Sequence, residues 1–114
     1  MPTYKPAAWM MYLSGAAHFI APFFSGFSLW SLLLVPAGAF WFLVGFTLIQ
    51  RRSRFLAGLL FVLALAGAIA ELDMGLGHWP VLPWVGWLIC LSDLGAALFL
   101  FLALWPGRDV AREG

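Results

Sequence analysis

The sequence contains very little charge. Only 10% of its 114 residues are Asp, Glu, Lys or Arg, whereas 64% are apolar. A soluble domain carries about 25% charged and about 45–50% apolar residues, and a chain of this size still exposes much of its surface. Six basic and five acidic side chains cannot cover such a surface. The composition therefore excludes a soluble globular domain, and it also excludes intrinsic disorder, which requires the opposite balance.

Other absences exclude whole classes of function. The single cysteine, Cys90, rules out an intrachain disulfide and any Cys-x-x-Cys redox or metal pair. The net charge is +1 and no long basic run is present, so we expect no nucleic-acid partner. The chain also lacks a glycine-rich phosphate loop, an HExxH motif and a GxSxG motif. We therefore expect no enzymatic activity and assign no catalytic residue and no metal ligand, and the sequence indicates no particular cofactor.

Four apolar segments are present instead, separated by turn residues, and each is close to the 20 or so residues that cross the hydrocarbon core. They cover residues 7–24, 29–49, 55–72 and 84–105. Each contains Gly, Ala or Ser near its middle, and small residues of this kind allow helices to pack closely in lipid. The sequence thus predicts an all-α integral membrane protein in which residues 1–114 form a single domain, a compact bundle of four transmembrane helices.

The basic residues predict the orientation of this bundle. With four spans, all six fall on one side of the membrane, and the positive-inside rule makes that side cytoplasmic. We expect both termini in the cytoplasm (N-in, C-in) and a bacterial cytoplasmic (inner) membrane as the location. The first segment also loosely matches a cleaved signal peptide, but its removal would destroy the even topology. The six basic residues are Lys5, Arg51, Arg52, Arg54, Arg108 and Arg112.

Asp93 lies near the centre of the fourth segment, where an aspartate costs about 2.5–3.5 kcal/mol on insertion scales. An ionisable residue at this depth is a candidate functional residue that needs a partner. His18, in the first segment, is expected at a depth that matches to within about one helical turn. The sequence therefore predicts an intramembrane polar pair, His18 and Asp93. Three roles remain open: a hydrogen bond between helices, contact with a ligand or partner, and proton transfer.

A second group of polar residues lies at the outer end of the third segment and in the loop that follows it. Glu71, Asp73 and His78 are expected to form an outer-face polar cluster. Two carboxylates and an imidazole are suitable ligands for a divalent cation. Their spacing is not diagnostic of a metal site, and a solvated polar rim is the preferred interpretation.

The length and the number of spans resemble those of the small multidrug resistance transporters. That family depends on a glutamate in the middle of its first span, whereas residues 7–24 contain no carboxylate. The resemblance is one of size and hydropathy, and no functional residue follows from it.

Two hypotheses for the function remain. The short loops, the many aromatic residues and the lack of a catalytic set favour an accessory or scaffold subunit that packs against a larger membrane complex. The alternative is a small oligomeric transporter or channel that uses Asp93 and His18 as intramembrane protonatable groups. The expected partners are the lipid bilayer and either other protein subunits or further copies of this chain.

Overall fold

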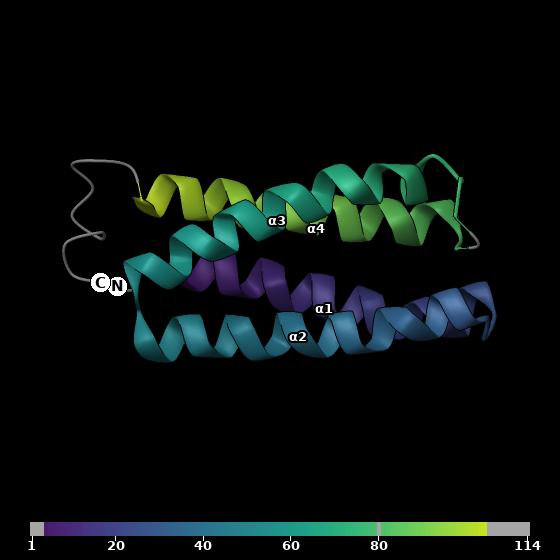
Figure 1. The fold of residues 1–114 in the computed structure, drawn as a ribbon, viewed down its shortest axis with the longest axis horizontal. Coiled ribbons are helices and arrows are strands. Elements are labelled where there is room, and N and C mark those ends of the chain that lie inside the picture. Colours follow the sequence, from purple (N-terminus) through teal and green to yellow (C-terminus); the bar gives the residue numbers. More distant parts are fainter. Residues whose placement is uncertain (1–3, 80, 105–114) are drawn as a thin grey trace.

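The computed structural model describes residues 4–79 and 81–104, which form four α-helices and no strand. Helices α1 (Lys5–Ser25), α2 (Leu29–Arg51), α3 (Arg54–Gly75) and α4 (Pro83–Leu104) run alternately in opposite directions (Figure 1). The predicted all-α class is confirmed. Trp105, Arg108 and Arg112, which the sequence analysis assigned to the fourth span and the cytoplasmic tail, lie outside the described residues.

Three of these helices are long and apolar enough to cross a membrane: α2 from Ser31 onward, α3 and α4. Helix α1 has 21 residues but is not in this set, because it carries Ser14, His18 and Pro22 among its apolar residues. Large apolar side chains are exposed on the outside of the bundle, including Leu43 and Val62 at more than 60% exposure. An apolar exterior of this kind suits lipid and is unfavourable in water.

Local signals define the helix ends. The side-chain oxygen of Ser28 accepts a hydrogen bond from the Ser31 N–H at 3.2 Å, and Ser53 does the same for the N–H of Leu56 at 3.2 Å. These N-caps satisfy N–H groups that have no partner within the helix. Arg52 ends α2 in the left-handed conformation, with φ of 51°. The turn between α2 and α3 is therefore only two residues long.

Helices that are consecutive in the sequence are not always neighbours in the bundle. Helix α1 packs against both α2 and α4, and α4 packs against α3, whereas α2 and α3 barely touch despite their short connection. Helices α1 and α2 approach most closely at Gly15 and Gly38. A Cβ atom on Gly38 would lie 2.7 Å from the Gly15 carbonyl oxygen and 2.9 Å from the Cβ of His18. The absence of a side chain at Gly38 therefore allows α2 to lie directly behind His18.

We expect the Gly38→Ala substitution to destabilise the bundle by about 1–3 kcal/mol, because the added methyl group must push the α1 backbone away. Gly58→Ala is the matched control, since a Cβ on Gly58 meets nothing within 4 Å. That control should be neutral or stabilising by about 0.5–1 kcal/mol. Unfolding in mixed detergent micelles measures both effects. Equal stability of the two variants would contradict the close approach of α1 and α2.

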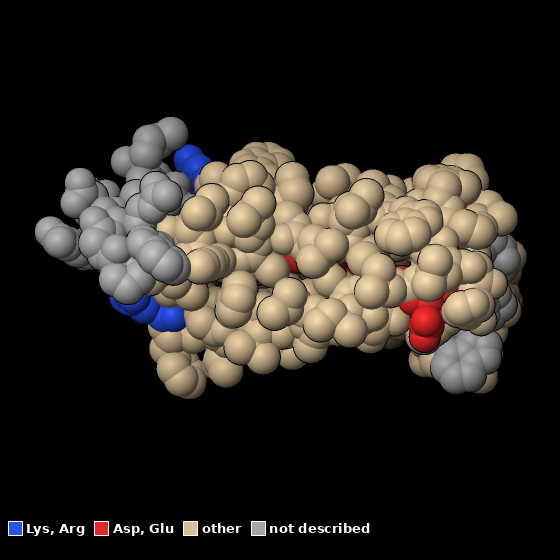
Figure 2. Space-filling model, turned by 90° about the horizontal axis from the view of Figure 1, so that it is seen from above, with Lys and Arg blue, Asp and Glu red and all other residues tan. Residues whose placement is uncertain are grey.

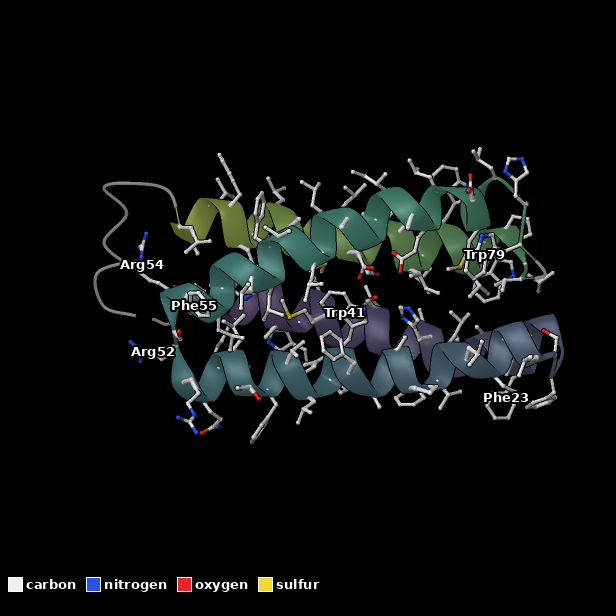
Figure 3. The ribbon with its side chains drawn as sticks, viewed as in Figure 1. Phe23, Trp41, Arg52, Arg54, Phe55 and Trp79 are labelled. Atoms are coloured by element: carbon white, nitrogen blue, oxygen red, sulfur yellow. The ribbon has the colours of Figure 1, made fainter. Side chains whose placement is uncertain are left out.

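The two ends of the bundle differ in charge. Arg52 and Arg54 lie at one end, which we call the arginine end, and Trp79 lies at the opposite end, which we call the loop end (Figure 3). The guanidinium of Arg54 donates a hydrogen bond to the Leu104 carbonyl oxygen at 3.4 Å and so joins the start of α3 to the end of α4. Lys and Arg side chains gather at the arginine end, and the most exposed acidic side chain lies toward the loop end, with further acidic atoms visible deep in the middle of the bundle (Figure 2).

Two clusters of buried apolar residues fill the interior, one toward each end. The arginine-end cluster draws on all four helices and includes Trp41, which is only 6% exposed and so lies inside the bundle (Figure 3). The loop-end cluster is smaller and includes Val81 from the connection between α3 and α4. Along α1 the arginine-end cluster stops at Met11 and the loop-end cluster starts at Ala17. Most of the buried polar residues lie where the two clusters meet.

Candidate functional site

Three helices contribute buried polar side chains to the region where the two apolar clusters meet. We call this set the polar layer. All its members are at most 8% exposed, and Asp93 is completely buried. They come from α1, α3 and α4, so the layer crosses the bundle. The members of the polar layer are Ser14, His18, Glu71, Ser92 and Asp93.

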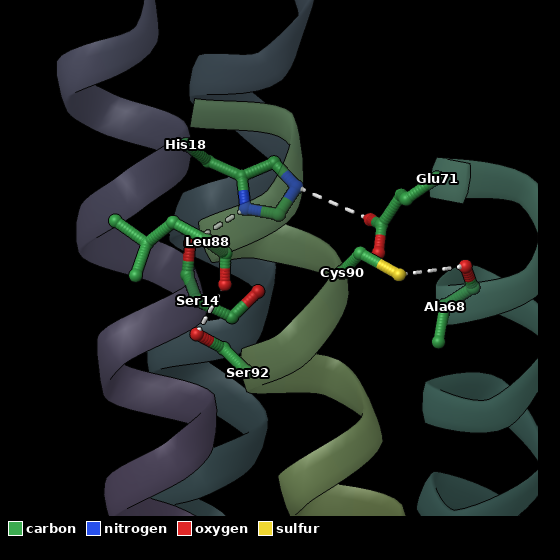
Figure 4. A network of polar contacts seen from close by, with 7 residues as sticks. All are labelled: Ser14, His18, Ala68, Glu71, Leu88, Cys90 and Ser92. Carbon is green, nitrogen blue, oxygen red and sulfur yellow. Dashed lines mark hydrogen bonds and ion pairs between the residues drawn. The ribbon is translucent and has the colours of Figure 1, made fainter. Parts of the chain in front are cut away.

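The hydrogen bond of His18 to the backbone determines its tautomer. Nδ1 of His18 lies 2.6 Å from the carbonyl oxygen of Ser14, one turn earlier in α1. A carbonyl oxygen only accepts hydrogen bonds, so Nδ1 carries a hydrogen and donates it. The other ring nitrogen, Nε2, points across the bundle at Glu71, 3.7 Å from its Oε2 atom (Figure 4). The histidine is thus oriented by α1 and directed at α3.

The structure separates Glu71 from the two residues with which the sequence analysis grouped it. Asp73 and His78 approach each other at the loop end, with 3.5 Å between Oδ1 and Nδ1, and both side chains are about two-thirds exposed. Glu71 is instead buried in the polar layer. The solvated-rim interpretation is therefore wrong for Glu71. Asp73 follows Glu71 by two residues in α3, and two residues turn an α-helix by about 200°. The two side chains therefore point to nearly opposite faces of the helix.

Asp93 lies on the facing helix α4, and its carboxyl group is beside that of Glu71. Gly67 makes room for both carboxyl groups. A Cβ atom on Gly67 would lie 3.5 Å from Oδ2 of Asp93 and 3.9 and 4.0 Å from the two oxygens of Glu71. The predicted partners His18 and Asp93 therefore belong to one cluster, and the group in contact with the His18 ring is Glu71. We call His18, Glu71 and Asp93 the buried triad.

The buried triad has too few hydrogen-bond donors. Oε1 of Glu71 and both oxygens of Asp93 lack a partner among the described residues. The Cys90 thiol donates to the carbonyl oxygen of Ala68 at 3.3 Å and the Ser92 hydroxyl to that of Leu88 at 2.6 Å (Figure 4). The Ser14 hydroxyl has no partner among the described residues. A buried carboxyl group without a partner is costly. Protons or a bound cation must therefore supply the hydrogen bonds or the charge that these carboxyl oxygens lack.

The contact between His18 and Glu71 needs a proton of its own. If the ring is neutral, Nε2 is an acceptor, because Nδ1 already carries the hydrogen. An acceptor nitrogen facing an ionised carboxylate is unfavourable, whereas a proton on either atom makes the contact attractive. Groups this close titrate as a unit, and the proton belongs to the pair. The geometry thus defines a position for one exchangeable proton in the interior of the bundle.

Among the described residues, no group of three or more His, Cys, Asp or Glu side chains is arranged to hold a metal ion. The divalent-cation alternative for Glu71, Asp73 and His78 has no geometric support, since Glu71 faces His18 and not the other two. No family model, no curated protein and no solved structure matches this chain. The interpretation of the buried triad therefore depends on its geometry and chemistry.

Proposed function

We propose that all four helices span the membrane, with the arginine end and both termini in the cytoplasm and the loop end outside. Helix α1 is long enough to span and packs along both α2 and α4, which are themselves apolar enough to do so. The basic residues at the arginine end all lie at helix ends: Lys5 and Arg54 begin α1 and α3, Arg51 ends α2, and Arg52 caps it. The positive-inside rule supports this orientation. The location that we propose is a bacterial cytoplasmic membrane.

We further propose that the protein is a small oligomeric transporter or channel in which the buried triad binds and releases protons. The observation that carries this proposal is the 3.7 Å contact between Nε2 of His18 and Oε2 of Glu71, two acceptors that attract each other only when one of them is protonated. A layer that served only to hold helices together would pair its donors and acceptors, because unpaired ones reduce stability. Here three carboxyl oxygens lack a donor. Oligomerisation is expected because four helices enclose little volume.

Proton flux into proteoliposomes tests this function. The purified protein is reconstituted with a pH-sensitive dye inside, and a potassium gradient with valinomycin drives protons inward. We expect acidification well above that of protein-free vesicles, because charged residues in a bundle interior commonly form proton pathways. Asp73→Asn, which removes an exposed carboxylate at the loop end, should behave like the wild type. Wild-type flux equal to that of protein-free vesicles would contradict the proposal.

An accessory or scaffold role is the second candidate. The observation in its favour is the sparse contact between α2 and α3, which leaves one side of the bundle available to a helix of another subunit. Purification from native membranes in mild detergent, with mass spectrometry of the proteins that are recovered, tests this role. A stoichiometric partner would support it. Recovery of this chain alone, as a homo-oligomer, would support the transporter or channel.

A further inference from the structure

The buried triad lies close to the aqueous boundary at the loop end. Asp73, whose side chain is about two-thirds exposed, is only two residues from Glu71, which corresponds to about 3 Å along α3. The Glu71 side chain is 11% exposed, against 3% for His18, and Asp93 is completely buried. Glu71 is therefore the member of the triad that lies nearest to the water at this end.

A much thicker apolar layer closes the opposite side of the triad. Glu71 lies about 25 Å from the start of α3 at Arg54. The arginine-end cluster occupies most of this distance, with large side chains from all four helices that are at most 6% exposed. They include Met11, Trp41, Leu60 and Leu100. An apolar constriction of this kind excludes water, so the described part of the arginine end offers no aqueous route to the triad.

We propose that Glu71 is the residue through which the buried triad exchanges protons with the loop end, while the arginine-end cluster keeps the triad closed to the opposite side. This inference rests on the proposed function and names the side from which the same site takes its protons. A transporter exposes its site to the two sides in turn. The structure then corresponds to the state in which the site is reached from the loop end.

The positions of the hydrogens define the transfers. The Glu71 carboxylate takes a proton from a hydronium ion at the loop end and becomes a carboxylic acid, leaving a water molecule. The proton then passes from Oε2 to Nε2 of His18, since Nδ1 keeps its hydrogen on the carbonyl oxygen of Ser14. The two atoms are 3.7 Å apart, and a movement of roughly 0.5–1 Å brings them to hydrogen-bonding distance. The products are a carboxylate and a doubly protonated ring, which attract each other.

Chemical labelling from each side of the membrane tests this route. Sealed membrane vesicles of the two opposite orientations, containing the full chain, are treated with a water-soluble carbodiimide and taurine. The carbodiimide activates a protonated carboxyl group, and taurine converts it to an amide that mass spectrometry detects. The sulfonate group of taurine prevents it from crossing the membrane. Asp73 is the internal control, because it is exposed at the loop end of the same helix and its labelling identifies the preparation that presents that end.

In the preparation in which Asp73 is labelled, we expect Glu71 to be labelled as well. In the opposite preparation the label on Glu71 should be at least about tenfold weaker, because the apolar cluster excludes the reagents. Glu71→Gln should remove this label and leave that on Asp73 unchanged, which checks the assignment. Equal labelling of Glu71 from both sides, labelling from the arginine end alone, or no labelling from either side would overturn the proposal.

The labelling test and the proton-flux test fail independently. Labelling requires no transport, so one-sided labelling in a protein without proton flux would contradict the proposed function alone. Proton flux in a protein whose Glu71 is labelled equally from both sides would instead remove the entry route and leave the proposed function in place.

Discussion

Replacing Glu71 with glutamine is expected to abolish proton flux while leaving the helices packed. The glutamine side chain keeps the shape of Glu71, and its amide can donate to Nε2 of His18 or to Asp93. It cannot hold or release a proton, so the chain of groups from His18 to Asp93 is interrupted at its middle member. Flux in proteoliposomes should fall by about tenfold or more, to the level of protein-free vesicles.

The control for this variant is Asp73→Asn, two residues further along the same helix. It removes a carboxylate of the same charge from an exposed position that does not contact His18. Both variants should retain the helical circular dichroism and the oligomeric state of the wild type. Unchanged flux in Glu71→Gln would show that the proton pathway does not include this residue.

Replacing Asp93 with asparagine is expected to stabilise the bundle and to impair its function. The substitution removes one of two adjacent buried carboxyl groups and brings in an amide whose N–H groups can donate to Glu71, whose Oε1 has no donor. Satisfying buried acceptors of this kind contributes about 1–3 kcal/mol. The free energy of unfolding in mixed micelles should therefore increase, while proton flux falls as in Glu71→Gln.

The combination of the two results is what distinguishes a functional site from a structural contact. If Asp93 served to hold the helices together, Asp93→Asn would lower stability or leave it unchanged, and flux would not depend on it. Unchanged flux together with unchanged recovery of protein partners would remove Asp93 from the candidate functional residues.

Much of the fold follows from the sequence because hydropathy and turn residues mark the helices directly. The segments predicted at residues 29–49 and 55–72 correspond to α2 and α3, which extend by one to three residues further at three of their four ends. The packing order of the helices could not be predicted in the same way. It depends on close approaches such as Gly15 against Gly38, and one sequence shows which residues are small but not which of them meet.

Part of the candidate site could also be predicted from the sequence. His18 and Asp93 could be singled out because each is a polar residue deep in an apolar segment. Glu71 was assigned instead to the outer-face polar cluster, because it lies only four residues from the end of α3, close to the polar loop. A signal for its burial exists nonetheless: Ala64, Ala68, Glu71 and Gly75 recur at helical spacing, and all four are buried. The periodicity of small residues places Glu71 on the packing face, and Asp73 lies off it.

The most direct test of the account is nitrogen-15 NMR of the two histidine side chains in the full chain, recorded across pH in detergent micelles or bilayers. His78 is exposed and serves as the internal control. We predict that His18 has its hydrogen on Nδ1, and that Glu71→Gln and Asp93→Asn each change the titration of His18 while leaving that of His78 unaffected. A His18 that is protonated on Nε2 when neutral, or that titrates identically in the wild type and both variants, would contradict the existence of the proton-binding triad.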